Sequence, residues 1–371
     1  MIGAGIAGIS TAYHLAKEGL KVVVVEQAQV ASGATGRNAG FILAGLAERY
    51  VRAVAIFGRG RTKELWSCTE DNHRRMAAFI DSNGLECGYR QGGSQQVGSD
   101  ALEATELEES AAMMHDDGFA VRYQSNPPPP LDGTDYQGCL TIDGDGEIDP
   151  VRFVRGAASI IEAQGVTIVE DSPVQHIDAS QLGTCVVNTA HASVRAHIGV
   201  LTTNAWCGDL VPELTNLIVP TRGQMLATAP CPPLFERPIY ANHGFEYWRQ
   251  LNDGRIVLGG WRYLDEDGER GTSEEVSAPI HDAMNGFLDR FAALRDVTIT
   301  HRWSGPMGFA RDGLPLIGPT PGHPSLLMAA GFTGHGFGWG WYSGALIRDW
   351  IIDGKPSVAT SLTPKRFLDA T

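Results

Sequence analysis

The sequence predicts an α/β protein built on a doubly wound sheet. Two observations near the N-terminus support this fold class: a glycine-rich turn opens the chain, and a helix and a β-branched run follow it in the order of a βαβ unit. A third is a second glycine-rich turn, at residues 331–338, that also leads into a helix. The chain has 371 residues, 43% of them hydrophobic, which is enough for two domains with separate cores.

The opening turn has the spacing of a dinucleotide-binding fingerprint. Gly3, Gly5 and Gly8 form its G-x-G-x-x-G pattern, and Ile6 and Ala7 lie between the last two of these glycines. Residues 6–18 have the apolar spacing of a helix, and the run at 21–26 is typical of a strand buried on both faces. The run ends in Glu26, at the position where an acid meets a ribose hydroxyl in such units.

The strand that should precede this turn is short in the sequence. Only Met1 and Ile2 stand before the first glycine, whereas a strand usually has about five residues. The first strand of a doubly wound sheet is central, so its loss would expose both neighbours. We therefore expect the natural protein to extend upstream by several apolar residues, with Met1 inside the strand.

A small-residue segment at 31–40 has no apolar periodicity, and two interpretations of it stay open. It is either an ordinary surface loop or a loop laid against a cofactor, since small residues allow close approach of the backbone. In the second case Arg37 could face a pyrophosphate with its planar fork.

Aspartate and proline at 149–150 predict a helix start, and Asp253-Gly254 predicts a hairpin between strands at 245–249 and 255–260. We further expect helices at 62–83, 101–117, 150–164 and 273–294, and strands at 166–170 and 194–203.

Charge and cysteine spacing exclude several function classes. The formal net charge of −14 argues against nucleic acid and anionic membranes as partners. The six cysteines have no metal-site spacing, so no metal site is expected. The apolar stretch at 41–57 is interrupted by charges, which predicts that it does not span a membrane. No signal peptide pattern is present at residues 1–20, so a cytoplasmic location is expected.

Eight motifs, spread in order along the whole chain, resemble those of one enzyme family. They are IGAGIAG, VVVVE, GATGRNAG, DPVRFVRGAA, VLTTNAW, VPTRGQMLAT, WSGPMGFARDGLPLIG and GFTGHGF. The family is the FAD-dependent amine oxidoreductases of the D-amino-acid oxidase-like (DAO) superfamily, which includes glycine oxidase, sarcosine oxidase and gamma-glutamylputrescine oxidase. The resemblance implies a glutathione-reductase-like FAD domain interleaved with a smaller α+β substrate domain. The FAD domain would comprise residues 1–80, 145–215 and 300–371, and the substrate domain residues 81–144 and 216–299.

The resemblance also implies a non-covalent FAD site. Gly305 stands about where a flavin-linking cysteine would be, and the 31–40 loop contains no histidine. The turn at 334–337 should face the pyrimidine edge of the flavin, where N–H groups and the helix dipole would stabilise negative charge. For His335, a structural role in a tight turn is as good an interpretation as a chemical one. The expected cofactor-binding residues are Gly3, Gly5, Ile6, Ala7, Gly8, Glu26, Gln27, Ser32, Arg37, Asn38, Ala39, Gly40, Val174, Thr203, Asn204, Gly334, His335, Gly336 and Phe337.

The reaction implied by the resemblance needs few protein side chains. A neutral amine places its α C–H over flavin N5, hydride leaves, and water hydrolyses the imine to a carbonyl product. O2, giving H2O2, or another acceptor then reoxidises the flavin. The expected partners are a small amine and this oxidant, and the sequence does not predict an oligomeric state.

Two departures from the family pattern narrow this interpretation. Amino-acid-oxidising members commonly have an arginine after Trp-x-Gly-x, and this chain has Met307 there. A thioether cannot make the bidentate contact with a carboxylate, so either Arg249 or Arg311 takes the role or the substrate lacks an α-carboxylate. We favour an amine without one, as in the gamma-glutamylputrescine oxidase branch. The second departure is the absence of lysine between Lys63 and Lys355, where the sarcosine oxidase branch has one near the flavin that helps to activate O2.

The substrate pocket is expected to be an aromatic, apolar chamber. Its candidate residues are His335, Tyr247, Arg249, Trp303 and Met307, with Phe245, Trp261 and Phe309 on the same segments. An amino-acid oxidase or dehydrogenase of the glycine, D-amino acid or sarcosine type is the alternative within the family. Two alternatives of other classes stay open: a single-Rossmann NAD dehydrogenase, and a non-catalytic or truncated relative that does not retain FAD.

Overall fold

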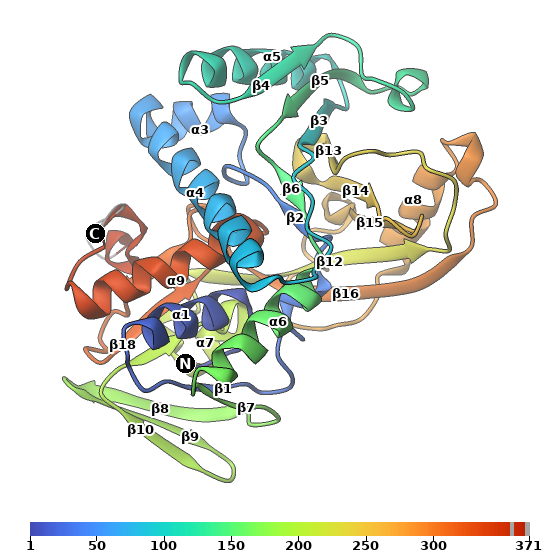
Figure 1. Cartoon of the computed structure of the whole chain (residues 1–371). Helices are drawn as coiled ribbons and strands as arrows, with labels where there is room; N and C mark the ends of the chain where they lie inside the picture. Colours follow the sequence, from blue (N-terminus) through green and yellow to red (C-terminus); the bar gives the residue numbers. More distant parts are fainter. Residues whose placement is uncertain (357–359, 368–371) are drawn as a thin grey trace.

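The structure is a computed structural model that describes residues 1–356 and 360–367 (Figure 1). It is a mixed α/β fold with a parallel-sheet layer and a larger, mainly antiparallel sheet. Its α-helices are α1 (Ile6–Lys17), α2 (Ala34–Arg37), α3 (Tyr50–Phe57), α4 (Arg59–Asn83), α5 (Ala101–Asp116), α6 (Pro150–Ala163), α7 (Cys207–Leu210), α8 (Ala278–Leu288) and α9 (Gly336–Ile352).

The parallel-sheet layer contains the opening of the chain. Its parallel pairs are β1 (Val23–Val25) with β7 (Thr167–Val169) and β11 (Gly199–Leu201) with β18 (Leu326–Ala330), and β17 (Leu316–Pro319) joins β18 in the antiparallel direction. Ile2 forms parallel bridges with both Val25 and Leu201, so it stands at the centre, between β1 and β11. Helices α1, α6 and α9 lie together against this layer (Figure 1), and α1 contacts both of the others.

The larger sheet has the strand order β16-β12-β15-β14-β13-β3-β5-β4. Its strands are β3 (Ser94–Gly98), β4 (Val121–Gln124), β5 (Gln137–Ile142), β12 (Ile218–Thr228), β13 (Ile239–Ala241), β14 (Glu246–Gln250), β15 (Ile256–Gly260) and β16 (Ile299–Ala310). Helix α8 packs on it around Trp248, which is fully buried. The smaller sheets are β2 (Phe41–Ile42) with β6 (Gly146–Glu147), and β8 (Val174–Gln181), β9 (Thr184–Thr189) and β10 (Ser193–Ala196).

Two elements differ from the sequence expectation. The stretch 194–203 is not a single strand, because β10 pairs with β9 and β11 pairs with β18 in another sheet. The helix expected at 273–294 is shorter, because Pro279 lacks an N–H and fits only the first turn of α8, which ends at Leu288. The predicted helices at 6–18, 62–83, 101–117 and 150–164 and the hairpin at 245–260 are confirmed.

The large sheet also includes a segment that we assigned to the FAD domain. Strand β16 pairs with β12 along its length, so residues 300–310 lie in the eight-stranded sheet. The last residues of the expected third FAD segment, 368–371, lie outside the described residues.

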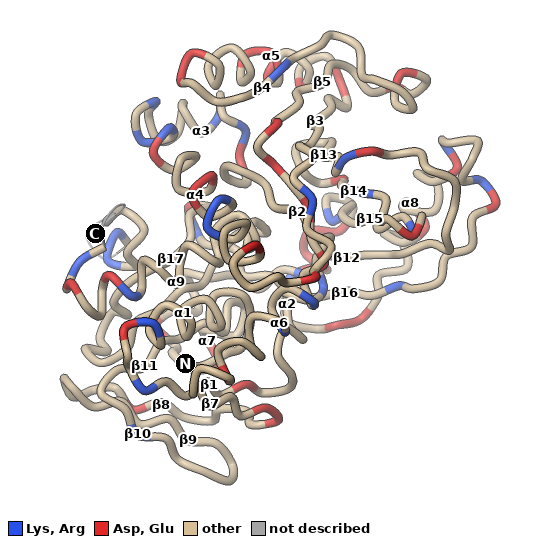
Figure 2. The backbone as a smooth tube through the Cα atoms, in the orientation of Figure 1, with Lys and Arg blue, Asp and Glu red and all other residues tan. Residues whose placement is uncertain are grey.

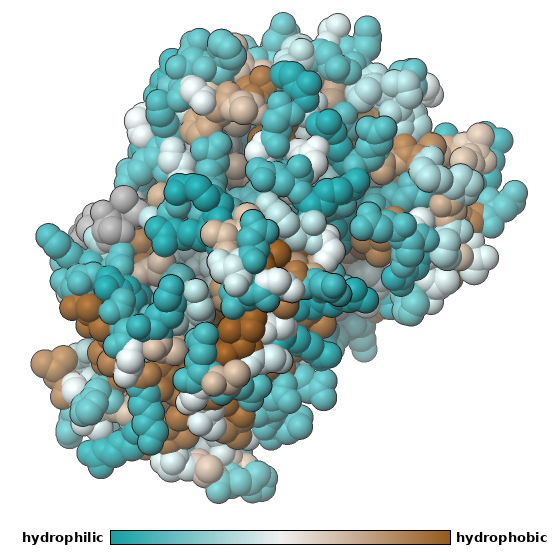
Figure 3. Space-filling view, in the orientation of Figure 1, coloured by the Kyte–Doolittle hydropathy of each residue, from teal (hydrophilic) through white to brown (hydrophobic). Residues whose placement is uncertain are grey.

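The surface carries charges of both signs. Acidic and basic residues are mixed over both layers rather than gathered in one region (Figure 2). In the space-filling view hydrophilic side chains cover most of the visible face, and hydrophobic ones gather in its lower half, over the parallel-sheet layer (Figure 3). Within residues 1–356 and 360–367, no helix combines the length and apolar content needed to cross a membrane.

Candidate functional site

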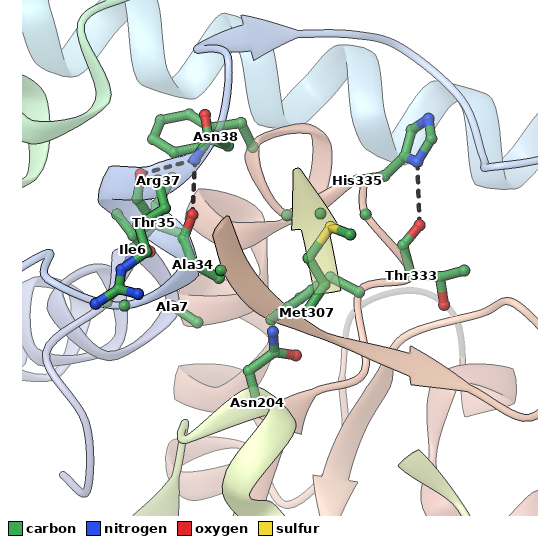
Figure 4. A pocket seen from close by; sticks show the side chains of 18 of the residues that line it. Ile6, Ala7, Ala34, Thr35, Arg37, Asn38, Asn204, Met307, Thr333 and His335 are labelled. Atoms are coloured by element: carbon green, nitrogen blue, oxygen red, sulfur yellow. Dashed lines mark hydrogen bonds between the residues drawn. The ribbon is translucent and has the colours of Figure 1, made fainter. Parts of the chain in front are cut away.

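One cavity is lined by residues of both layers of the fold, and Figure 4 shows some of their side chains. Its volume is about 350 Å³, within the range of about 300–1,000 Å³ that is usual for small-ligand pockets. Its lining comes from the opening turn, the 31–47 segment, residues 202–210, the hairpin region, β16 and the start of α9.

The opening turn presents the N-terminus of α1 to one end of the cavity. Gly5 has no side chain with which to cap this helix, and the N–H of its first residue, Ile6, donates to Oγ1 of Thr35 at 3.1 Å. Glu26, only 8% exposed, holds the turn by accepting hydrogen bonds from the N–H groups of Ala4 (2.7 Å) and Ala28 (3.0 Å). The N-terminus of α1 therefore presents the positive end of its dipole to an anion in the cavity.

Gly8 allows α1 to approach this turn. A Cβ at Gly8 would lie 2.0 Å from the carbonyl oxygen of Gly3 and 2.8 Å from Oγ1 of Thr202. Gly3 itself has φ +102°, a conformation that glycine adopts without strain. The fingerprint glycines are therefore required by backbone packing as well as by the approach of a ligand.

The 31–40 loop lies against the same cavity and contains the short helix α2. Asn38 braces the loop: its Nδ2 donates to the carbonyls of Ala34 and Thr35, and its Oδ1 accepts from the N–H of Gly40. Arg37 lines the cavity and forms an ion pair with Glu274 at 2.7 Å. The loop thus forms one wall of the cavity.

Helix α9 presents a second N-terminus to the cavity. Among the described residues no side chain caps it at His335. The preceding residues Thr333 (φ +51°) and Gly334 (φ +78°) turn the chain sharply into the helix. Asn72 of α4 fixes the first turn, since its Nδ2 donates to the carbonyl of Phe337 at 2.8 Å. Burial lowers the pKa of His335, so this histidine is neutral at pH 7.

These features fit a bound FAD. Two helix N-termini that line the cavity suit a pyrophosphate and an electron-rich flavin edge. Gly305 leaves room for Arg37, because a Cβ there would meet the arginine Cδ at 2.8 Å. Among the described residues no group of three His, Cys, Asp or Glu side chains is arranged to hold a metal ion.

The other end of the cavity is aromatic. Tyr240 and Tyr247 stack with ring centroids 5.6 Å apart, and the Tyr240 ring lies 6.2 Å from that of His335. The Tyr247 hydroxyl donates to the sulfur of Met225 at 3.3 Å, and burial raises its pKa to about 12. Met307 and Phe309 of β16 complete this wall. Both tyrosines therefore remain protonated and neutral.

Most of the predicted site residues line this one cavity. Among the pocket candidates these are His335, Tyr247, Met307 and Phe309. Among the cofactor candidates they are Gly3, Gly5, Ile6, Ala7, Glu26, Gln27, Ser32, Arg37, Asn38, Ala39, Val174, Thr203, Asn204, Gly334, His335, Gly336 and Phe337.

The remaining candidates lie behind the cavity wall. Trp303 donates from Nε1 to the carbonyl of Arg37 at 2.9 Å and so supports the loop. Gly40 packs against the carbonyl of Ile148, Gly8 packs against the opening turn, and Phe245 and Trp261 pack outside the lining. Arg311 is exposed outside the cavity.

Arg249 is placed differently from our expectation that it faces the substrate. It is 6% exposed, donates from Nη2 to the carbonyl of Ile148 at 2.8 Å, and lies 3.5 Å from a carboxylate oxygen of Glu147. Its charge is therefore directed into the protein, where it joins β14 to β6. The cavity has a different arginine, Arg262, which we did not single out from the sequence.

Comparisons with known proteins agree with this geometry. The sequence profile of the DAO family, described as FAD dependent oxidoreductase, matches residues 1–350. The chain belongs to this family. It is accordingly an FAD-dependent oxidoreductase, with FAD as its cofactor. The donors to be considered are amines and amino acids.

Individual relatives are distant but cover nearly the whole chain. The gamma-glutamylputrescine oxidoreductase of Escherichia coli (strain K12) is 27% identical over 361 residues, which are 91% of this chain and 79% of that protein. The glycine oxidase of Bacillus licheniformis is 26% identical over 371 residues, 96% of this chain and 93% of that protein. The crystal structure of L-proline dehydrogenase from P. horikoshii has a TM-score of 0.84 at 21% identity, covering 99% and 96% of the two chains. At that identity the likeness concerns the fold alone.

Proposed function

We propose that the chain oxidises the C–N bond of a small amine at the carbon that carries the nitrogen. The observation that carries this proposal is the aromatic end of the cavity, which continues directly from the two helix N-termini that suit FAD. The names of two relatives, a gamma-glutamylputrescine oxidoreductase and a glycine oxidase, support an amine or amino-acid donor.

The chain's own residues position the amine and keep it neutral. FAD, when bound, accepts the hydride that leaves the α-carbon, and water hydrolyses the resulting imine to a carbonyl compound. Tyr240, Tyr247 and Phe309 surround the donor with rings, and an apolar environment lowers the pKa of an amine by desolvation. A neutral amine retains the lone pair that drives loss of hydride. His335 adds no competing charge, because burial keeps it neutral.

Anaerobic reduction of the purified, FAD-containing protein tests the proposal. A panel of amines and a panel of amino acids are mixed with the protein, and bleaching of the flavin absorption is followed. We expect at least one compound with a C–H next to nitrogen to bleach the flavin, and O2 or another acceptor to restore its colour. Failure of both panels on protein that holds FAD would contradict the proposal and favour a non-catalytic relative.

A further inference from the structure

Arg262 enters the cavity because of an unusual turn at the end of β15. Gly260 has φ +121° and Trp261 has φ +58°, so two consecutive residues take positive φ angles. Trp261 is fixed by a hydrogen bond from its N–H to the carbonyl of Phe245 and by its ring, 3% exposed and 5.2 Å from that of Phe287. A strained backbone held by packing often marks a functional position. Here it directs the next side chain, Arg262, into the cavity.

The Arg262 guanidinium is held by rings rather than by acids. Its Cζ lies 4.3 Å from the ring centroid of Phe245 and 5.0 Å from that of Phe309. Stacking on rings uses the faces of the guanidinium and leaves its N–H edge available for hydrogen bonds. The side chain is therefore positioned without any of its donors being used.

Within residues 1–356 and 360–367, the side chain of Arg262 forms no ion pair and no hydrogen bond. The exposed Glu266 acts on it only at longer range, and burial lowers its pKa. The other arginine of the cavity, Arg37, differs in having Glu274 at 2.7 Å and the carbonyl of Ser32 at 3.0 Å. Partial burial of a cation without a counter-charge costs folding free energy, and a bound anion offsets this cost.

Among the described lining residues, no second arginine and no lysine accompanies Arg262 at this end of the cavity. Met307 stands where the family resemblance would place a carboxylate-binding arginine, and His335 is neutral. Tyr240 and Tyr247 are protonated, and a phenol can donate a hydrogen bond to an anion. An anion that enters this chamber would therefore meet Arg262 as a full positive charge, whereas the other arginine of the lining, Arg37, is already paired with Glu274.

We propose that Arg262 binds a carboxylate of the substrate, and that the amine oxidised by this chain therefore carries an acid group. The inference rests on the proposed function and names its substrate class. It gives the carboxylate-binding role, for which Arg249 and Arg311 were considered from the sequence, to a residue on the β15 turn. A guanidinium edge and a carboxylate form a bidentate pair, which fixes the orientation of the amine in the chamber.

Binding of a carboxylate probe to the FAD-containing protein tests this inference without turnover. The probes are benzoate and its neutral isostere benzamide, and the readout is the change that each causes in the flavin absorption spectrum. We expect benzoate to bind the unmodified protein at least tenfold more tightly than benzamide. In Arg262→Met, which keeps an unbranched apolar stem between the rings, the benzoate Kd should rise at least tenfold while the benzamide Kd stays unchanged.

Two further variants separate charge from structure. Arg262→Lys should recover part of the benzoate affinity, because it retains the charge but not the planar fork. Arg311→Met, at an exposed arginine outside the cavity, should bind benzoate like the unmodified protein. The inference is overturned if benzoate binds Arg262→Met, with its full content of FAD, as tightly as it binds the unmodified protein. It is equally overturned if benzamide and benzoate bind the unmodified protein alike.

The two proposals fail in different ways. If neither amines nor amino acids reduce the FAD but benzoate binding depends on Arg262, the proposed function fails and the carboxylate site stands. If amines reduce the FAD while benzoate binding does not depend on Arg262, the inference alone fails. A matched pair of donors, phenylglycine and benzylamine, should favour phenylglycine in the unmodified protein, and this preference should disappear in Arg262→Met.

Discussion

Substitution of Gly8 by alanine tests whether the opening turn is built by close packing. The new Cβ would lie 2.0 Å from the carbonyl oxygen of Gly3, whereas Cβ contacts in proteins are longer than 3.0 Å. Helix α1 or the turn must therefore move by roughly 1 Å, and overpacking of this kind costs about 1–3 kcal/mol of folding free energy. This turn is the one that we expect to present N–H groups to FAD. The Kd of FAD should therefore also rise about tenfold, equivalent to about 1.4 kcal/mol.

The matched control is Gly286→Ala in α8. Both glycines are helical, but a Cβ at Gly286 would meet no described atom within 4 Å. Alanine there should stabilise the helix by about 0.5–1 kcal/mol, because it is the better helix former. The assays are chemical denaturation of the apo-protein and titration of FAD. The reasoning is refuted if Gly8→Ala unfolds like the control and binds FAD with unchanged affinity.

Two further predictions concern buried charges. Burial raises the pKa of Asp145 from 3.8 to about 7, so the folded state holds this proton more tightly than the unfolded chain does. Stability is therefore lost as the pH rises from about 4 to 7, by about 4 kcal/mol at 1.36 kcal/mol per pH unit. Relative to the unmodified protein, Asp145→Asn should gain stability between pH 4 and pH 8 in denaturation curves, and a constant difference would contradict this. Arg249→Met should lower the unfolding free energy by about 1.5–3 kcal/mol through loss of charged hydrogen bonds. It should leave the benzoate Kd unchanged, and a weakened benzoate affinity would return Arg249 to the substrate site.

Local signals in the sequence predicted much of the fold. Asp149 and Pro150 marked the start of α6, where the Asp149 side chain caps the N–H of Arg152. The pairing of β14 with β15 follows from the short turn at 251–255, in which Gly254 has φ +89°. The glycine fingerprint followed by a β-branched run identified α1 and β1. Each of these features depends on residues a few positions apart, so the sequence alone carries it.

Features that depend on distant contacts were not predictable in the same way. The split of 194–203 into β10 and β11 depends on which partner strand each half meets. Arg249 is turned away from the cavity by Glu147, about a hundred positions earlier in the chain, and Arg262 is turned into it by two positive φ angles. A sequence shows that an arginine is present but not which acid neutralises it. The paired Arg249 and the unpaired Arg262 therefore could not be distinguished from the sequence alone.

The most direct test of the central claim is the rate at which a reducing amine bleaches the bound FAD under anaerobic conditions. The amine is prepared with hydrogen or with deuterium on the carbon next to nitrogen, and the two rates are compared by stopped flow. If this cavity holds FAD against that carbon, the deuterated donor should reduce the flavin several-fold more slowly. Equal rates, measured where reduction depends on the bound complex rather than on encounter, would contradict the account.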